Sequence, residues 1–123
     1  MPSKIMVVDD SKVMHTLYDL TLRRYSGCKI VHAMDGKEAL ALLREHADCE
    51  LIILDVNMPV MDGLEFLKHY GAGSFARRAP IIVVSTHGRD DERQRGLEAG
   101  ASAYLTKPFQ PTDLQAMINQ ILG

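Results

Sequence analysis

LIILDVNMPVMDG, residues 51–63, is the stretch that decides the fold. Its first four residues are apolar and lead directly to one carboxylate, Asp55, and turn-forming Asn, Pro and Asp-Gly residues follow. The pattern predicts a buried strand over 51–55 that ends at Asp55. Two interpretations of this carboxylate stay open at this point, because aspartate at a strand end also caps turns and helices.

Length and composition limit the class of protein. The 123 residues are 46% hydrophobic, enough for a core, and predict a single domain over 1–123. The formal net charge is −2, which gives no electrostatic reason to expect nucleic acid or a membrane surface as partner. No apolar run approaches membrane-spanning length and no signal peptide is evident, so we expect a cytoplasmic protein. Cys28 and Cys49 lack metal-ligand spacing and are expected to be free thiols.

Strand-like and helix-like segments alternate along the chain. Apolar runs predict five strands, at 4–8, 29–33, 51–55, 81–84 and 101–106. Helical spacing or capping-box spacing predicts five helices, which begin near 11, 35, 62, 89 and 111. Strand 29–33 is less apolar than the others, which predicts an edge position, and helix 89–99 has so few apolar residues that we expect it to be weakly held. Right-handed crossovers then predict an α/β fold, a doubly wound five-stranded parallel sheet with helices on both faces.

Polar side chains stand at the carboxyl ends of four of the five predicted strands. They are Asp9 and Asp10, Asp55, Ser85 and Lys107. In a doubly wound sheet, ligands bind beyond these strand ends. Convergence from four strands is hard to explain by solvation alone, and it predicts a functional site.

Three neighbouring carboxylates repel one another. At an effective dielectric constant of about 20, each pair about 4 Å apart opposes folding by roughly 4 kcal/mol. Mg²⁺ would relieve the repulsion, since it prefers oxygen ligands and leaves room for a phosphate oxygen. Together with Lys107 it would leave the site neutral and able to receive a phosphoryl group. Asp55 could then act as nucleophile, while Ser85, Lys107 and the metal each hold one phosphoryl oxygen.

Four blocks of sequence carry a family resemblance. They are Asp9-Asp10, Asp55 within LDVNMPVMDG, Ser85, and GASAYLTKPF at 100–109. Together they resemble a bacterial two-component response-regulator receiver domain, most of all the single-domain chemotaxis (CheY-like) type. The resemblance implies a flavodoxin-like (βα)5 fold with strand order 2-1-3-4-5.

The same resemblance implies a role for each metal and phosphoryl residue. Asp55 is the expected phosphoacceptor and a metal ligand. Asp9 and Asp10 are expected to bind Mg²⁺, with the backbone carbonyl of Asn57 as a further ligand. Asn57 and His87 are expected to modulate dephosphorylation.

The resemblance also implies how the signal is passed on. Ser85 and Tyr104 are the expected switch pair, although Ser85 stands where the family most often has Thr. Lys107 is expected to pair with the phosphoryl group, and the Lys107–Pro108 peptide bond to be cis. From sequence alone, Tyr104 is better explained as a half-buried strand aromatic, and its position in the matched block is what favours the switch role.

Partners and reaction type follow from the resemblance. We expect phosphoryl transfer from a sensor histidine kinase or phosphotransfer protein, and a downstream protein that binds helix 89–99, strand 101–106 and the last helix. No nucleic acid or membrane is expected, and the chain would be a monomer or a phosphorylation-dependent dimer. It would not be a turnover enzyme.

Other interpretations stay open. A Mg²⁺-dependent phosphohydrolase of haloacid-dehalogenase type would need Asp-x-Asp on the first strand, but Ser11 stands two residues after Asp9. A nucleotide-binding flavodoxin-like domain would need a glycine-rich loop there, and an interaction module would not be phosphorylated at all. The histidines show no ligand spacing and are expected at the surface or satisfied locally. They are His15, His32, His46, His69 and His87.

Overall fold

A computed structural model describes most of the chain. It covers residues 2–55, 66, 68, 70, 79–85, 97, 98 and 100–122. Phe66, Lys68 and Tyr70 are helical, as are Leu97 and Glu98. The remaining parts of the predicted helices 62–70 and 89–99 lie outside the described residues.

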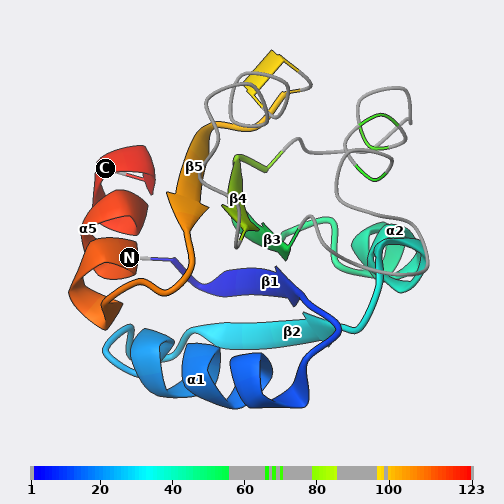
Figure 1. Ribbon diagram of the computed structural model, residues 1–123. Coiled ribbons are helices and arrows are strands. Elements are labelled where there is room, and N and C mark those ends of the chain that lie inside the picture. The colour runs from blue at the N-terminus through cyan, green and yellow to red at the C-terminus, as the bar shows by residue number, and fades with distance from the viewer. Residues whose placement is uncertain are drawn as a thin grey trace.

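Five parallel strands form one sheet. They are β1 (Lys4–Val8), β2 (Lys29–Ala33), β3 (Leu51–Asp55), β4 (Ile81–Ser85) and β5 (Ala103–Thr106). Their order is β2-β1-β3-β4-β5 and every neighbouring pair is parallel (Figure 1). The predicted fold class and strand order are therefore confirmed, and β2 is an edge strand as predicted.

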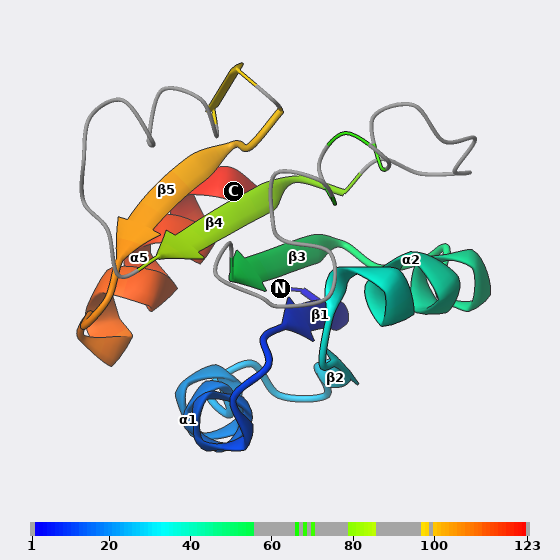
Figure 2. The same ribbon diagram turned by 45° about the vertical axis from the view of Figure 1, so that its right-hand side comes forward.

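Helices cover both faces of the sheet. α1 (Lys12–Leu22) and α5 (Pro111–Leu122) pack on one face, and α2 (Gly36–Glu45) packs on the other (Figures 1 and 2). The starts of α1 and α2 follow from local chemistry, because the side chains of Ser11 and Asp35 accept hydrogen bonds from backbone N–H groups three residues later. Pro111 occupies the first turn of α5, where its missing N–H is tolerated.

The core has two halves, one on each side of the sheet. Alternate residues of each central strand point to opposite faces. Ile5, Val7 and Ile53 face α1 and α5, whereas Met6 and Ile52 face α2. The central strands β1, β3 and β4 are buried on both faces, which explains their unbroken apolar sequences.

The apolar stripe of α1 is not its buried face. Val13, Leu17 and Leu20 supply much of the helical spacing, yet they are 78%, 37% and 54% exposed. The buried side chains of α1 are His15, Tyr18, Thr21 and Leu22. The sequence therefore predicts the helix correctly, while the face that packs on the sheet contains a histidine, a tyrosine and a threonine.

Strand β5 begins two residues later than predicted. Gly100 has a positive φ of 116°, and the chain turns there before it joins the sheet. The N–H of Ser102 donates to Ile81 O at 2.8 Å, and regular pairing starts only when Ala103 meets Ile82. Strand β4 includes Ser85, one residue beyond the predicted end.

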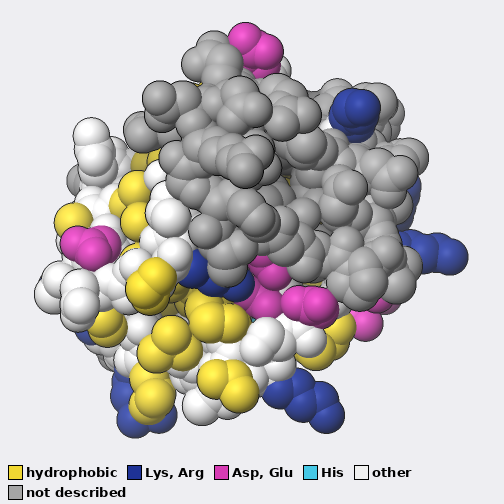
Figure 3. Space-filling model, viewed as in Figure 1, with side chains coloured by type: hydrophobic (Ala, Val, Ile, Leu, Met, Phe, Trp, Pro, Cys, Tyr) yellow, Lys and Arg dark blue, Asp and Glu magenta, His cyan; other side chains and the backbone are white. Residues whose placement is uncertain are grey.

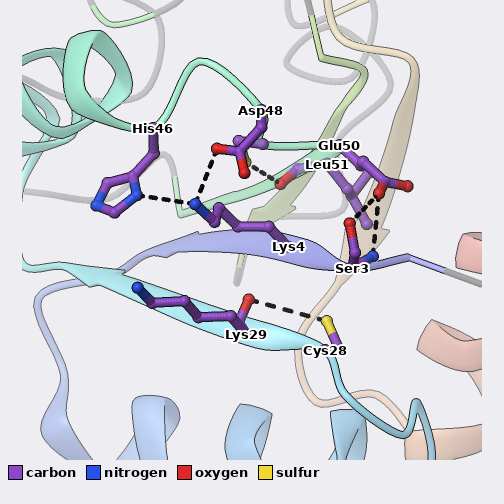
Figure 4. Close-up of polar contacts among 9 residues, drawn as sticks. Ser3, Lys4, Cys28, Lys29, His46, Asp48, Glu50 and Leu51 are labelled. Atoms are coloured by element: carbon purple, nitrogen blue, oxygen red, sulfur yellow. Dashed lines mark hydrogen bonds and ion pairs between the residues drawn. The ribbon is translucent and has the colours of Figure 1, made fainter.

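Polar residues also gather where β1 and β3 begin, a region we call the amino edge (Ser3, Lys4, His46, Asp48 and Glu50). Lys4 Nζ lies 2.8 Å from Asp48 Oδ1 and 3.2 Å from His46 Nδ1. Ser3 donates hydrogen bonds to Glu50 through both its backbone N–H and its hydroxyl (Figure 4). Nearby, both cysteines are free as predicted, and Cys49 is buried.

Candidate functional site

The carboxyl ends of β1 and β3 bring three acids together. Val8 pairs with Leu54 in the parallel register, so the residues that follow each of them, Asp9 and Asp55, lie side by side at the carboxyl end of the sheet. Carboxylate oxygens of Asp9, Asp10 and Asp55 all lie within 4.8 Å of one another. We call these three acids and Lys107 the carboxyl edge.

Two of the three acids are buried. Asp9 is 1% exposed and Asp55 is 4% exposed, whereas Asp10 is exposed to solvent. Asp9 is fixed by hydrogen bonds, since its Oδ1 accepts from Ser11 N at 2.8 Å and its backbone N–H donates to Ala33 O at 3.1 Å. The cluster therefore has a rigid inner side and one open side at Asp10.

Lys107 is the cation of the carboxyl edge. Its Nζ lies 3.2 Å from Asp9 Oδ2 and 3.8 Å from Asp55 Oδ2. Its backbone N–H donates to Ser85 O at 2.7 Å, which ties the end of β5 to the end of β4. The Lys107–Pro108 peptide bond is cis, as the family resemblance implies. The sheet thus brings together Lys107 and Asp9, which are 98 residues apart in the sequence.

One lysine does not balance three carboxylates. The four side chains of the carboxyl edge leave two negative charges in excess, partly buried and close together. Several oxygen donors around an open side fit a hard divalent cation such as Mg²⁺, which keeps some of its waters. When bound, Mg²⁺ would neutralise this excess, held by Asp9, Asp10 and Asp55.

Ser85 and Tyr104 lie on the same face of the sheet. Val83 pairs with Tyr104 and Ser85 pairs with Thr106, so alternation places Val83, Ser85 and Tyr104 on one side. Ser85 is fully buried and Tyr104 is 9% exposed, with its ring in the half of the core that faces α2. The arrangement makes the two side chains neighbours along the sheet.

Two predicted site residues cannot be placed. Asn57 and His87, the residues expected to modulate dephosphorylation, lie outside the described part of the chain. Most of the predicted helix 89–99, and with it one part of the expected downstream face, also lies there.

Tyr18 is a neighbour of the site that the sequence does not indicate. It is 1% exposed, stacks on Phe109 with ring centroids 6.1 Å apart, and its hydroxyl has no hydrogen-bond partner among the described residues. Burial raises the pKa of Tyr18, and the charges of Asp9 and Asp55 raise it further. The hydroxyl therefore stays protonated close to the acids.

An apolar groove adjoins the carboxyl edge. Its volume is about 330 Å³ and its lining is Met14, Leu17, Lys107, Pro108 and Phe109. The exposed stripe of α1 continues it, and Figure 3 shows hydrophobic side chains gathered in this part of the surface. Apolar side chains next to a charged site are typical of a surface that binds another protein.

None of the helices that the structure describes is long and apolar enough to cross a membrane.

Comparison with known proteins identifies the family. Residues 5–119 match the response regulator receiver domain family. The chain is 38% identical over 120 residues to the chemotaxis protein CheY homolog of Campylobacter jejuni. This match covers 98% of this chain and 92% of the relative. Chemotaxis protein CheY1 of Helicobacter pylori is 37% identical, with 98% and 97% covered.

Longer relatives and solved structures match as well. The phosphate regulon transcriptional regulatory protein PhoB of Escherichia coli is 34% identical, and the match spans 52% of its length. The crystal structure of chemotaxis protein CheY4 of Vibrio cholerae superimposes with a TM-score of 0.87 at 35% identity, covering 98% of this chain and 99% of that one. The family consists of signalling proteins and not of classical turnover enzymes. This chain therefore belongs to the response regulator receiver domain family.

Proposed function

We propose that the chain is a single receiver domain over 1–123 that accepts a phosphoryl group on Asp55 and thereby changes its affinity for a partner protein. The observation that carries the proposal is the excess of negative charge at the carboxyl edge. Asp9, Asp10 and Asp55 meet within 4.8 Å around one lysine, a charge arrangement that is unfavourable unless a divalent cation is bound, and the neutralised site can then receive a phosphoryl group.

Asp55 is the proposed nucleophile because it ends β3 at the position that the family resemblance implies for the phosphoacceptor, with Lys107 Nζ 3.8 Å from its Oδ2. One carboxylate oxygen attacks phosphorus, so that a P–O bond forms while the P–N bond of a phosphohistidine on the donor breaks. The histidine leaves with the bonding electrons and takes a proton from solvent. Bound Mg²⁺ would supply charge neutralisation and hold one phosphoryl oxygen, with the Asn57 carbonyl as a further ligand.

Lys107 and Ser85 are proposed to hold the transferred group. Lys107 Nζ is 3.8 Å from Asp55 Oδ2, close enough to pair with a phosphoryl oxygen after a small movement. The Ser85 hydroxyl would donate to another oxygen, since Ser85 ends the strand next to Asp55. Asn57 and His87 would then set the lifetime of the phosphoryl group.

The output is proposed to pass through Tyr104. Movement of the Ser85 hydroxyl toward the phosphoryl group changes the space available to the Tyr104 ring on the same face of the sheet. A ring that shifts in this place alters the outer surface of β5, which together with α5 and residues 89–99 would bind the downstream protein.

The phosphodonor is proposed to be a sensor histidine kinase or a phosphotransfer protein. The groove of Met14, Leu17 and Phe109 offers an apolar docking surface beside Lys107, so that a donor bound there would present its phosphohistidine to Asp55. Two of the relatives named above are chemotaxis proteins, which favours chemotaxis as the pathway. We further propose that the protein is cytoplasmic and that it is a monomer or a phosphorylation-dependent dimer.

Incubation with acetyl phosphate and Mg²⁺ tests the proposal. Intact mass should rise by one phosphoryl group in the wild type and should not rise in Asp55→Asn. An equal rise in both proteins would contradict the assignment of Asp55. Steady release of phosphate from an ester substrate over many turnovers would favour the phosphohydrolase interpretation instead.

Lys107→Ala separates phosphorylation from output. We expect this variant to accept some phosphoryl groups but to lose the gain in partner affinity, because the ammonium that pairs with the phosphoryl group is missing. Equal partner affinity of the phosphorylated variant and the phosphorylated wild type would contradict this role.

A further inference from the structure

Two histidines that are far apart in sequence meet beside the carboxyl edge. His15 lies on α1 and is 8% exposed, and His32 lies on the edge strand β2. Their ring centroids are 4.7 Å apart with an angle of 69° between the ring planes, and their Nδ1 atoms are separated by 2.6 Å. The sequence spacing gives no sign of this pair, because only the packing of α1 against β2 creates it.

The other nitrogen of each ring faces a group that only accepts hydrogen bonds. His15 Nε2 lies 2.7 Å from the backbone oxygen of Asp9, and His32 Nε2 lies 3.0 Å from Asp19 Oδ1. A carbonyl oxygen and an ionised carboxylate have no proton to donate, so both Nε2 atoms carry the hydrogen. In two neutral rings, both Nδ1 atoms are then unprotonated and direct their lone pairs at each other.

Facing lone pairs at this distance repel unless a cation lies between them. A shared proton meets that need but makes one ring cationic, whereas a metal ion meets it with both rings neutral. We propose that Nδ1 of His15 and Nδ1 of His32 bind a first-row transition-metal ion, with Zn²⁺ as the ion to test first. On binding, the ion replaces any shared proton, which passes to water.

The surroundings of both rings are those of metal-bound histidines. A ligating histidine commonly donates its second ring N–H to a carboxylate or a backbone carbonyl, which fixes the tautomer and the ring orientation. His32 has the carboxylate of Asp19 in this place, and His15 has the carbonyl of Asp9. Both Nδ1 atoms are therefore held as ligands before an ion arrives.

Binding requires only a small opening of the pair. Zinc–nitrogen bonds of about 2.0–2.1 Å in a tetrahedral site place two nitrogens about 3.3 Å apart. The Nδ1 atoms at 2.6 Å must therefore separate by about 0.7 Å. The side chain of His32 is 36% exposed on an edge strand, so its ring can move and water can complete the coordination.

The histidine pair and the carboxyl edge would select different ions. Imidazole suits zinc and other late first-row metals, whereas the carboxylates of Asp9, Asp10 and Asp55 suit Mg²⁺. The histidine pair is thus independent of the proposed phosphorylation of Asp55, and it contacts the carboxyl edge through the hydrogen bond from His15 Nε2 to the backbone oxygen of Asp9.

Zn²⁺ titration in the presence of excess Mg²⁺ tests the proposal. Mg²⁺ keeps the acids occupied, and calorimetry measures the affinity while long-range ¹H–¹⁵N spectra report on each ring nitrogen. We expect one Zn²⁺ per chain, with the largest shifts at Nδ1 of His15 and His32. His32→Asn should weaken binding by at least about tenfold, and Asp19→Asn by about tenfold.

His46→Asn is the matched control, because His46 lies at the amino edge and also has a polar Nδ1 contact, to Lys4. It should bind Zn²⁺ as tightly as the wild type. Equal Zn²⁺ affinity in His32→Asn and the wild type would overturn the proposal, as would a Zn²⁺ response confined to the carboxylates. Ring nitrogens that change only with pH and not with Zn²⁺ would show a shared proton and would also overturn it.

Discussion

Each end of the sheet has a lysine among carboxylates, and the two lysines differ in what surrounds them. At the amino edge, Lys4 and Asp48 form a pair at 2.8 Å with the Asp48 side chain 69% exposed. At the carboxyl edge, Lys107 is 3.2 Å from Asp9, whose side chain is 1% exposed. The shorter contact, between Lys4 and Asp48, is the one exposed to water, where an ion pair contributes little to stability.

The two edges differ more in their net charge than in the distance between lysine and carboxylate. Lys4 and Asp48 balance each other, and the second acid of the amino edge, Glu50, accepts two hydrogen bonds from Ser3, so this edge has one excess negative charge (Figure 4). Lys107 faces three acids that lie within 4.8 Å of one another, two of them buried, so the carboxyl edge keeps two excess negative charges in a small and partly buried space. The comparison shows that a functional site is recognised by what its interactions leave unsatisfied. A ligand can then supply the missing interaction.

The largest expected difference between the edges is their response to Mg²⁺. At a concentration one hundred times its dissociation constant, Mg²⁺ should raise the free energy of unfolding of the wild type by about 2.7 kcal/mol. Asp10→Asn should lose most of this gain because a ligand at the open side is missing. Urea unfolding with and without Mg²⁺ measures this gain in each protein.

Asp48→Asn is the control for that experiment, because it removes a carboxylate from the amino edge. This variant should gain as much from Mg²⁺ as the wild type does. An equal loss in Asp48→Asn and Asp10→Asn would remove the distinction between the edges.

The next largest effect is expected on the free energy of unfolding in the absence of metal. Asp55→Asn removes one of three repelling charges, so in the presence of a chelator it should raise the free energy of unfolding by about 2 kcal/mol. Asp48→Asn should act in the opposite direction, since it breaks a favourable pair. Urea unfolding measures both, and a destabilised Asp55→Asn would mean that Lys107 already compensates the acids.

Near the carboxyl edge, the buried hydroxyl of Tyr18 lowers the free energy of unfolding by a smaller amount. Its buried hydroxyl has no partner among the described residues, so Tyr18→Phe should raise the free energy of unfolding by about 1 kcal/mol. Thermal unfolding checks this, with Tyr25→Phe as control, because the Tyr25 hydroxyl donates to Asn119 Oδ1 at 3.0 Å and its loss should destabilise. A destabilised Tyr18→Phe would show that the Tyr18 hydroxyl is hydrogen-bonded after all.

The smallest effect is expected at the amino edge. The hydrogen bond from Lys4 lowers the pKa of Asp48 below its usual 3.8. A carboxyl group with a lowered folded-state pKa stabilises the fold above its unfolded pKa, and this contribution is lost as pH falls through the folded value. NMR titration should find the pKa of Asp48 raised in Lys4→Met and in high salt. A pKa that responds to neither would show that the pair does not persist in solution.

Sequence reasoning was most reliable where one interaction dominates. The bounds predicted for β1, β2 and β3 are exact. For β1 and β3 the reason is burial on both faces, which demands an unbroken apolar run. Strand ends also located Asp9, Asp55 and Lys107, since a parallel sheet gathers its carboxyl ends at one edge.

The missed features depend on packing between distant segments. The buried face of α1 includes His15 and Tyr18 because that face meets the sheet, while Leu17 of its apolar stripe lines the groove. The contact of His15 with His32 requires both the phase of α1 and the edge position of β2. Periodicity alone carries neither piece of information.

Locating the phosphoryl group tests the central claim most directly. After treatment with acetyl phosphate and Mg²⁺, borohydride reduces an aspartyl phosphate to homoserine, which a peptide mass map identifies by position. We expect homoserine at position 55 only, and none when Mg²⁺ is chelated. Homoserine at Asp9 or Asp10, or at no position under conditions that phosphorylate a known receiver domain, would contradict it.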